Sequence, residues 1–121
     1  MKYKTFKILL LLSFFLFFSC NEKPKFNKTE WNIKGDLKSY PNREKMLFDL
    51  TENNKLKGLT YKELVEKVGE PLQSTNEPNK IFYNIETKYG NDIDPIFVKI
   101  LEFEFNKDNL VTNFKITEFK N

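Results

Sequence analysis

Apolar residues between positions 59 and 71 repeat with the spacing of one face of an α-helix. This stripe consists of Tyr61, Leu64, Val65 and Val68. Thr60 and Glu63 have the T-x-x-E spacing of a capping box, in which each side chain hydrogen-bonds the backbone amide of the other residue. Gly69 suits the C-terminal cap, and Pro71 prevents continuation of the helix. We therefore predict a helix over Tyr61 to Val68, with structural roles for the four residues that cap and end it.

A second helical stripe lies upstream and consists of Met46, Leu47 and Leu50. Pro41 or Asn42 starts this helix, which we predict over residues 42–54. Arg43 extends the apolar face by one turn and is the single arginine beside 19 lysines. A planar guanidinium can donate two hydrogen bonds side by side. We therefore expect Arg43 to hold residues 92–95 in place by donating to a carboxylate or to exposed carbonyls there. The alternatives are contact with a partner or a lipid phosphate, and chance in the composition.

From Ile81 onward the apolar pattern changes to period two, which indicates strands. We predict strands over 81–86, 96–105 and 110–119, a long loop over Thr87 to Pro95 and a turn over 106–109. In the second strand the two halves have opposite apolar phase, so either both faces are partly covered there or a bulge shifts the register. Short connections favour an antiparallel meander. The predicted fold is α+β, with two short helices on one face of a three-stranded antiparallel sheet in the order α-α-β-β-β.

One core should form where the helix stripes meet the sheet. The residues expected to be largely buried are Leu50, Leu64, Val68, Tyr83, Leu101, Phe103 and Phe114. The opposite sheet face and the exposed edge strand remain available to a partner, by side-chain contact or by strand addition.

The first nineteen residues differ from the rest and are predicted to be a signal peptide. They contain three lysines and no acidic residue, and Ile8 to Phe18 is apolar except for Ser13. Eleven helical residues span about 17 Å, which is too short to cross roughly 30 Å of hydrocarbon. The segment is therefore an export signal rather than a spanning anchor.

The signal ends at the single cysteine of the chain. Ser19-Cys20 at the end of the apolar run resembles the lipobox of bacterial lipoproteins, which implies acylation of Cys20 and attachment to a lipid bilayer. The alternative is an ordinary secretory signal with Cys20 as an incidental thiol. Residues 20–40 are then a lipidated cysteine and a flexible tether, and 41–121 form the folded domain. Trp31 to Ile33 and Leu37 are candidates for a short segment that packs onto the core.

Composition excludes several classes of function. After the leader, 17 basic and 17 acidic residues balance, so the net charge of +3 gives no reason to expect a nucleic-acid partner. The absence of histidine and the single cysteine exclude a histidine-based triad, a Cys/His zinc site, a CxxC pair and an internal disulfide. We expect no metal and no cofactor.

Carboxylates are the remaining candidates for catalysis. A carboxylate-based hydrolase could use Asp92, Asp94, Glu102 and Glu104. Residues 91–94 lack the spacing of an EF-hand calcium loop.

Lys57 to Pro71 and the Leu101 to Phe105 hairpin strand resemble the small SmpA/OmlA envelope lipoproteins, the BamE-like group, over roughly residues 41–119. The resemblance implies the fold of the β-lactamase inhibitor protein and a non-catalytic accessory role in outer-membrane protein assembly or envelope integrity. It also favours the outer membrane over the inner membrane. An inhibitor-like protein that blocks a hydrolase is the alternative.

The long loop is the predicted contact with an envelope protein partner. Tyr89 and Ile93 are apolar points among polar residues, and Asp92 lies between them. The alternative is an ordinary solvated loop.

Overall fold

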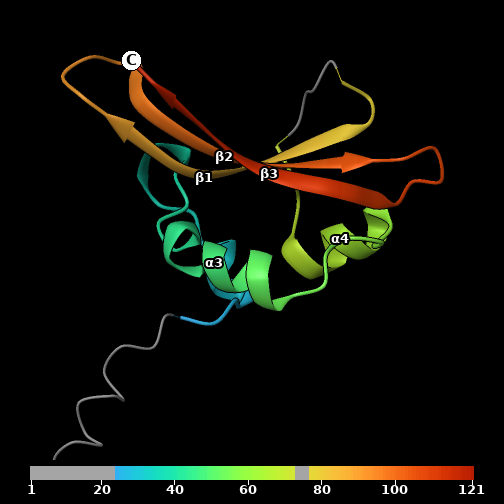
Figure 1. The fold of residues 1–121 in the computed structure, drawn as a ribbon. Helices are drawn as coiled ribbons and strands as arrows, with labels where there is room; N and C mark the ends of the chain where they lie inside the picture. The colour runs from blue at the N-terminus through green and yellow to red at the C-terminus, as the bar shows by residue number, and fades with distance from the viewer. Residues whose placement is uncertain (1–23, 73–76) are drawn as a thin grey trace, which may run out of the picture.

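The computed structural model describes residues 24–72 and 77–121, which form a three-stranded antiparallel sheet with helices on one face (Figure 1). The α+β prediction and the order of two helices followed by three strands are confirmed, with two additional short helical segments before them. The elements are α2 (Lys28–Trp31), the 3₁₀ helix η1 (Asp36–Lys38), α3 (Arg43–Asn53), α4 (Tyr61–Val68), β1 (Lys80–Tyr89), β2 (Pro95–Phe105) and β3 (Val111–Lys120).

The predicted signal peptide and Cys20 lie outside the described residues. Within the described ranges, no helix is both long enough and apolar enough to cross a membrane.

Helix α4 begins and ends at the predicted residues. The amide of Glu63 donates to Thr60 Oγ1 at 3.1 Å, and the amide of Thr60 donates to Glu63 Oε1 at 3.0 Å, so the capping box is complete. The hydrogen bond from the Thr60 amide, followed by the Thr60 side chain, holds the pKa of the Glu63 carboxyl below its usual range. Leu64 and Val68 are fully buried. The cap fixes where the helix starts, and burial of the stripe supplies the stability that eight residues lack in isolation.

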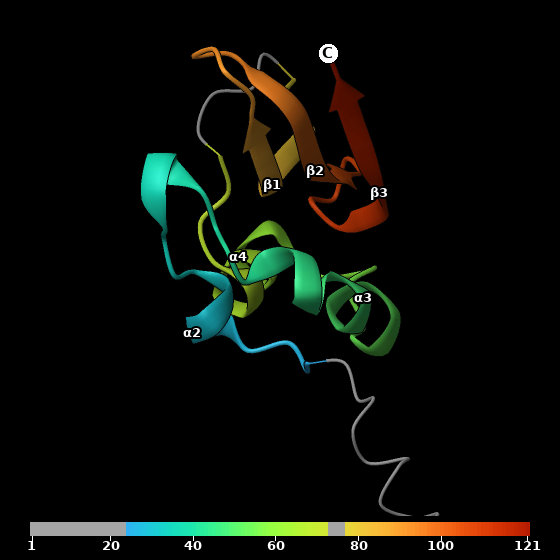
Figure 2. The ribbon, with the colours of Figure 1, turned by 90° about the vertical axis from the view of Figure 1, so that its left-hand side faces the viewer.

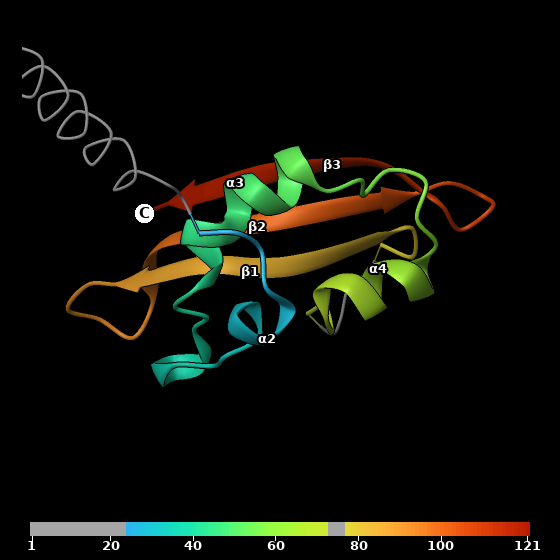
Figure 3. The same ribbon diagram turned by 90° about the horizontal axis from the view of Figure 1, so that it is seen from below.

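The helices cover one face of the sheet and leave the other uncovered. Figure 2 shows the helical layer on one side of the sheet, and Figure 3, which views the molecule from the helix side, shows α3 across β2 and β3, with α2 and α4 alongside β1. In α3, Met46, Leu47 and Leu50 are buried toward the sheet, as predicted. The apolar stripes of two helices therefore meet one side of the sheet.

The loop between β1 and β2 is shorter than predicted. Thr87 to Tyr89 continue β1, and Pro95 begins β2, so the Thr87 to Pro95 loop prediction is wrong at both ends. Thr87 pairs with Val98 in the ladder. Backbone pairing with β2 overrides the polar character of this stretch, and only residues 90–94 connect the strands.

Bulges lie at Ile85 in β1 and at Ile96 near the start of β2, and neither falls between the two halves of β2. The register of β1 against β2 shifts between Asn84 and Glu86, which adds Ile85 to the fully buried core. Along β2, Val98 and Ile100 are half-buried on the outer face. The change of apolar phase in β2 thus reflects partial burial on both faces.

Six of the seven predicted core residues are fully buried, and Phe114 packs partly buried against them. The core also contains Trp31, which is 0% exposed, so the expectation that this segment packs onto the core is confirmed for Trp31, whereas Ile33 is 42% exposed. Phe26 packs edge-on against the Trp31 ring at 5.5 Å between centroids, and its amide donates to Asp49 Oδ2 at 2.6 Å. The prediction of a flexible tether over residues 20–40 is therefore wrong from Phe26 onward. The burial of a large aromatic ring holds this segment to the domain.

Candidate functional site

The two most exposed large hydrophobic residues of the described chain lie together at one end of the sheet. Ile93 in the β1–β2 connection is 93% exposed, and Leu37 in η1, far away in the sequence, is 72% exposed. They line one groove with Tyr89, which is 40% exposed. We call Leu37, Tyr89 and Ile93 the loop-end patch. An apolar cluster of this kind marks an interaction surface more often than a scattered exposed residue does.

All three residues predicted to contact a partner line this groove, because Asp92 joins Tyr89 and Ile93 there. Leu37 was expected to pack onto the core, and that expectation is wrong. Its exposure could not be found from the apolar pattern alone, because it depends on the backbone of the turn that carries it.

The turn from Gly35 to Ser39 directs Leu37 away from the core. Leu37 and Lys38 both have positive φ, at 55° and 58°. The turn is closed by the Gly35 amide, which donates to the Ser39 carbonyl at 2.8 Å, and by the Ser39 amide, which donates to the Asp36 carbonyl at 3.0 Å. A left-handed conformation costs an L-residue roughly 1–2 kcal/mol. Strained backbone of this kind is concentrated at functional sites.

The other two residues of the loop-end patch, Tyr89 and Ile93, belong to the β1–β2 hairpin, whose strands are paired next to the loop. Tyr89 pairs with Pro95 across the hairpin. The C-terminal residue Asn121 donates its side-chain amide to the Pro95 carbonyl at 3.1 Å and its backbone amide to Ile96 at 3.1 Å. Ile93 is therefore displayed at the tip of a short hairpin whose base is held by three chain segments.

Charged side chains of both signs surround the loop-end patch. Lys38 and Asp92 line the same groove as the apolar residues. An apolar centre with a mixed polar rim is the usual composition of a protein-binding surface. The patch fits a protein partner better than a strongly charged ligand.

Arg43 is 2% exposed and has a structural role. It donates Nη1 to the Asn84 carbonyl at 2.7 Å, Nε to the Trp31 carbonyl at 3.0 Å and Nη2 to Asn32 Oδ1 at 3.3 Å. Its Cζ atom lies 3.4 Å from the centroid of the Tyr40 ring. Burial lowers the pKa of Arg43 to about 10. The guanidinium joins α2, α3 and β1, and the predicted contact with residues 92–95 is wrong.

Asn32 extends this polar cluster to the end of α4. Its Nδ2 atom donates to the Val68 carbonyl at 2.9 Å. Gly69 has a φ of 116°, and a Cβ atom at this position would lie 2.5 Å from Asn32 Oδ1. The hydroxyl of Tyr83 donates to the Gly69 carbonyl at 2.8 Å, and burial raises the pKa of Tyr83. Glycine is required at 69 both for its backbone conformation and for this close approach.

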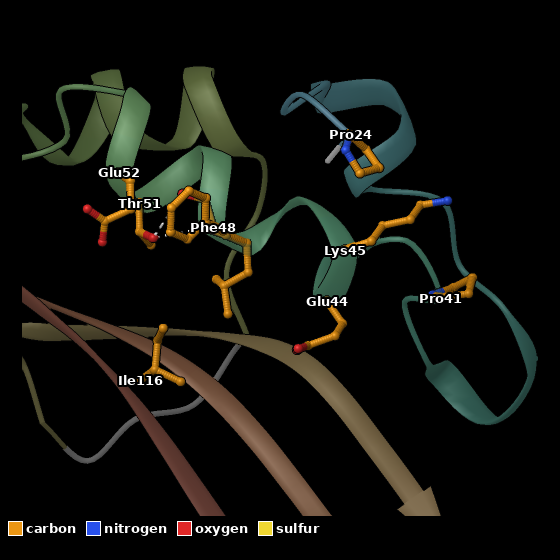
Figure 4. A pocket seen from close by; sticks show the side chains of 9 residues that line it. Pro24, Pro41, Glu44, Lys45, Phe48, Thr51, Glu52 and Ile116 are labelled. Atoms are coloured by element: carbon orange, nitrogen blue, oxygen red, sulfur yellow. Dashed lines mark hydrogen bonds between the residues drawn. The ribbon is translucent and has the colours of Figure 1, made fainter. Parts of the chain in front are cut away.

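A second groove separates α3 from β3 (Figure 4). Phe48 of α3 and Ile116 of β3 lie on its two sides and are 55% and 45% exposed. Its other lining residues are Pro24, Pro41, Glu44, Lys45, Leu47, Thr51 and Glu52. This groove was not predicted from the sequence, because it depends on how far the outer face of α3 stands from the edge of the sheet.

The carboxylates considered for hydrolysis do not converge. Asp92 and Asp94 lie in the β1–β2 loop, whereas Glu102 and Glu104 lie on the outer face of β2. Asp94 and Glu102 are eight positions apart, or about 26 Å along a strand at roughly 3.3 Å per residue, so the loop carboxylates and the strand carboxylates do not form one site. Glu102 is held between Lys80 at 3.8 Å and Lys115 at 3.4 Å. In the described part of the chain no three acidic or other metal-binding side chains group around a common point.

Comparison with protein-family models, with curated proteins and with solved structures found no match to this chain.

Proposed function

We propose that this protein is a non-catalytic binding module of the bacterial cell envelope, anchored by acyl chains on Cys20, which contacts an envelope protein through the loop-end patch. The lipobox-like Ser19-Cys20 supports the anchor, and the resemblance to the SmpA/OmlA group supports an accessory role at the outer membrane. The lack of histidine and the separation of the carboxylates support a role in binding rather than catalysis.

The observation that carries the proposal is the exposure of Leu37 and Ile93 on one groove. Full burial of a leucine or isoleucine side chain stabilises a complex by about 1.5–3 kcal/mol relative to exposure. A partner that covers both residues gains this energy, and the tyrosine beside them adds a large rigid contact of the kind enriched at interfaces. The paired hairpin and the closed turn present these side chains with little entropy left to lose on binding.

The anchor places the domain close to the bilayer. Because Phe26 is fixed against Trp31, the chain is tethered over a shorter distance than the sequence suggested. From Cys20 to Pro24 an extended chain reaches at most about 14 Å at 3.6 Å per residue. Pro24 lies beside α3, so the helical layer faces the membrane side of the domain.

Processing tests the anchor. We expect the wild-type protein to partition into the detergent phase and Cys20→Ser to accumulate as unprocessed precursor. A soluble mature protein that begins downstream of Cys20 would contradict the anchor without affecting the proposed binding surface.

Capture from solubilised envelope tests the binding role. The wild-type protein should recover a discrete envelope protein, and the Leu37→Ser, Ile93→Ser double variant should recover at least tenfold less. Ile33→Ser is the matched control, because Ile33 is 42% exposed and lies outside the patch. Recovery of a barrel-insertion complex identifies an assembly accessory, whereas recovery of a soluble hydrolase identifies the inhibitor-like alternative. Equal recovery by all three forms would contradict the role of the patch.

A further inference from the structure

The backbone of β3 is paired on one side only over most of its length. β3 is an edge strand, and its first residue, Val111, exchanges hydrogen bonds with Gly58 and Leu59. At the other end, the amide of Asn121 donates to the Ile96 carbonyl of β2. Residues of an antiparallel strand alternate between facing the neighbour and facing away. The β3 residues whose backbone groups face away from β2 are therefore Phe114, Ile116, Glu118 and Lys120.

These outward groups have no hydrogen-bond partner among residues 24–72 and 77–121. The opposite edge of the sheet is covered by the protein's own chain. There the Leu72 amide donates to the Phe82 carbonyl at 2.8 Å, and Arg43 Nη1 donates to the Asn84 carbonyl at 2.7 Å. One edge is thus closed by internal contacts, while the four outward residues of β3 remain available to another strand.

We propose that a second copy of this chain pairs with β3 in antiparallel orientation about a two-fold axis at Thr117, which joins the two sheets into one. The proposal is independent of the function assigned to the loop-end patch, which lies at the hairpin end of the sheet. A two-fold axis at Thr117 lies at the centre of the outward run 114–120. Every outward residue of one copy then faces an outward residue of the other, so the whole run can enter one ladder.

The side chains on the outer face are complementary in this register. Lys115 lies opposite Phe119 of the second copy, and Thr117 lies opposite its own counterpart. Phe119 is 57% exposed on an edge strand. Pairing covers this ring and places the Lys115 ammonium of the other copy beside it, where a cation–π contact can form. Threonine pairs across strands also stabilise a sheet. No two like charges are directly opposite each other on this face.

On the helix side of the edge, too, no two like charges lie directly opposite each other. Lys120 lies opposite Phe114 of the second copy, and Glu118 lies opposite Ile116. The groove beside α3 leaves room on this side for the incoming side chains, and Ile116 is 45% exposed there. Glu118 is already neutralised by Lys99 at 3.6 Å, which limits repulsion between the two copies of this carboxylate.

The symmetry is compatible with two anchors in one membrane. When two sheets join edge to edge with antiparallel strands, the two-fold axis is perpendicular to the sheet. Both helical layers then lie on the same side. Because Pro24 lies at the groove beside α3 on the helix side of each copy, both chains approach the domain from the same direction.

Disulfide trapping in the envelope tests the register with the full chain. Residue 117 and its counterpart form a non-hydrogen-bonded pair about 4.5 Å apart at Cα, which suits a disulfide. Lys115 and its counterpart are displaced by four residues, or about 13 Å. Under mild oxidation Thr117→Cys should give a species of twice the monomer mass, whereas Lys115→Cys and the wild type should give at most one-tenth as much. Absence of the Thr117→Cys dimer, equal trapping at both positions, or trapping of a different protein would each overturn the proposal.

Loss of one outward amide supplies a second test. Glu118→Pro removes a donor that the β2–β3 ladder does not use, and proline is tolerated on an edge strand at such a position. Glu118→Ala is the matched control, since it loses the same carboxylate but keeps the amide. When two differently tagged full-length copies are solubilised from membranes, Glu118→Pro should reduce co-purification at least fivefold relative to Glu118→Ala. Equal co-purification of both variants would overturn strand pairing, and a folding defect of the proline variant would leave the trapping result decisive.

Discussion

Arg43 Nη1 donates a 2.7 Å hydrogen bond to the main-chain carbonyl of Asn84, 41 residues further along the chain. Asn84 directly precedes the bulge residue of β1, and its carbonyl points out of the sheet edge. The guanidinium satisfies this carbonyl and that of Trp31 at the same time. A lysine ammonium could not donate in two fixed directions while lying flat on the Tyr40 ring. The contacts give a physical reason for the single arginine of the chain.

Arg43→Lys should therefore destabilise the fold by about 2–4 kcal/mol, because a buried charge keeps only part of its hydrogen bonds. Urea unfolding measures this change. Lys45→Arg, on the exposed side of the same helix, is the control and should change stability by less than about 0.5 kcal/mol. Equal, small effects of both substitutions would show that the arginine is replaceable.

Gly69→Ala should cost more than Gly58→Ala. Both glycines have positive φ, at 116° and 88°, but only at Gly69 would a Cβ atom collide with Asn32. We expect about 1 kcal/mol for Gly58→Ala from backbone strain alone, and at least about 1 kcal/mol more for Gly69→Ala. In an Asn32→Ala background the excess at Gly69 should disappear. A double-mutant cycle without coupling would contradict the close approach of these two residues.

Loss of the helix cap should cost less than loss of core volume. Thr60→Ala removes one cap hydrogen bond and should cost about 1 kcal/mol. Leu64→Ala and Phe103→Ala empty fully buried positions and should cost about 2–5 kcal/mol each. Thermal or chemical denaturation of the three variants gives the order. If Phe103→Ala left the melting temperature unchanged, the inward face of β2 would be assigned wrongly.

Acid should release the N-terminal segment from α3. The Phe26 amide and then the Asn53 side chain donate to Asp49, and these bonds lower the pKa of Asp49. A carboxyl whose pKa is depressed on folding stabilises the fold above its unfolded pKa of about 3.9, and this contribution is lost as the pH falls through the folded value.

Nuclear magnetic resonance can follow this titration directly. The Asp49 carboxyl should titrate below the ordinary aspartate value, and the Phe26 amide should shift with the same midpoint. Asp49→Ala should abolish the pH dependence of that amide shift. A Phe26 amide that does not respond to the Asp49 titration would contradict the tie between the segment and the helix.

Local signals in the sequence predicted the parts of the fold that depend on local contacts. The capping box and stripe of α4 lie within nine residues, and they predicted its bounds correctly. The alternation of Leu101 and Phe103 identified the inward face of β2 for the same reason. These features follow from short-range periodicity.

The rest could not be predicted, because it depends on distant residues. Trp31 was identified from the sequence as a candidate for packing onto the core, but its hydrogen bond with Arg43 and its place between α2, α3 and β1 depend on residues far along the chain. The loop-end patch was half predicted. Ile93 could be identified from the composition of its loop, whereas the exposure of Leu37 depends on a left-handed turn that carries no glycine at that position.

Photo-crosslinking from position 93 in living cells tests the central claim most directly. A photoreactive residue in place of Ile93, at the tip of the β1–β2 hairpin, should yield a discrete adduct with an envelope protein, and Leu37→Ser should weaken that adduct. The same residue at Lys107, in the turn between β2 and β3, is the control and should yield no such adduct. Identical adduct patterns from both positions, no adduct from position 93, or an adduct of only two copies of this chain would contradict the account.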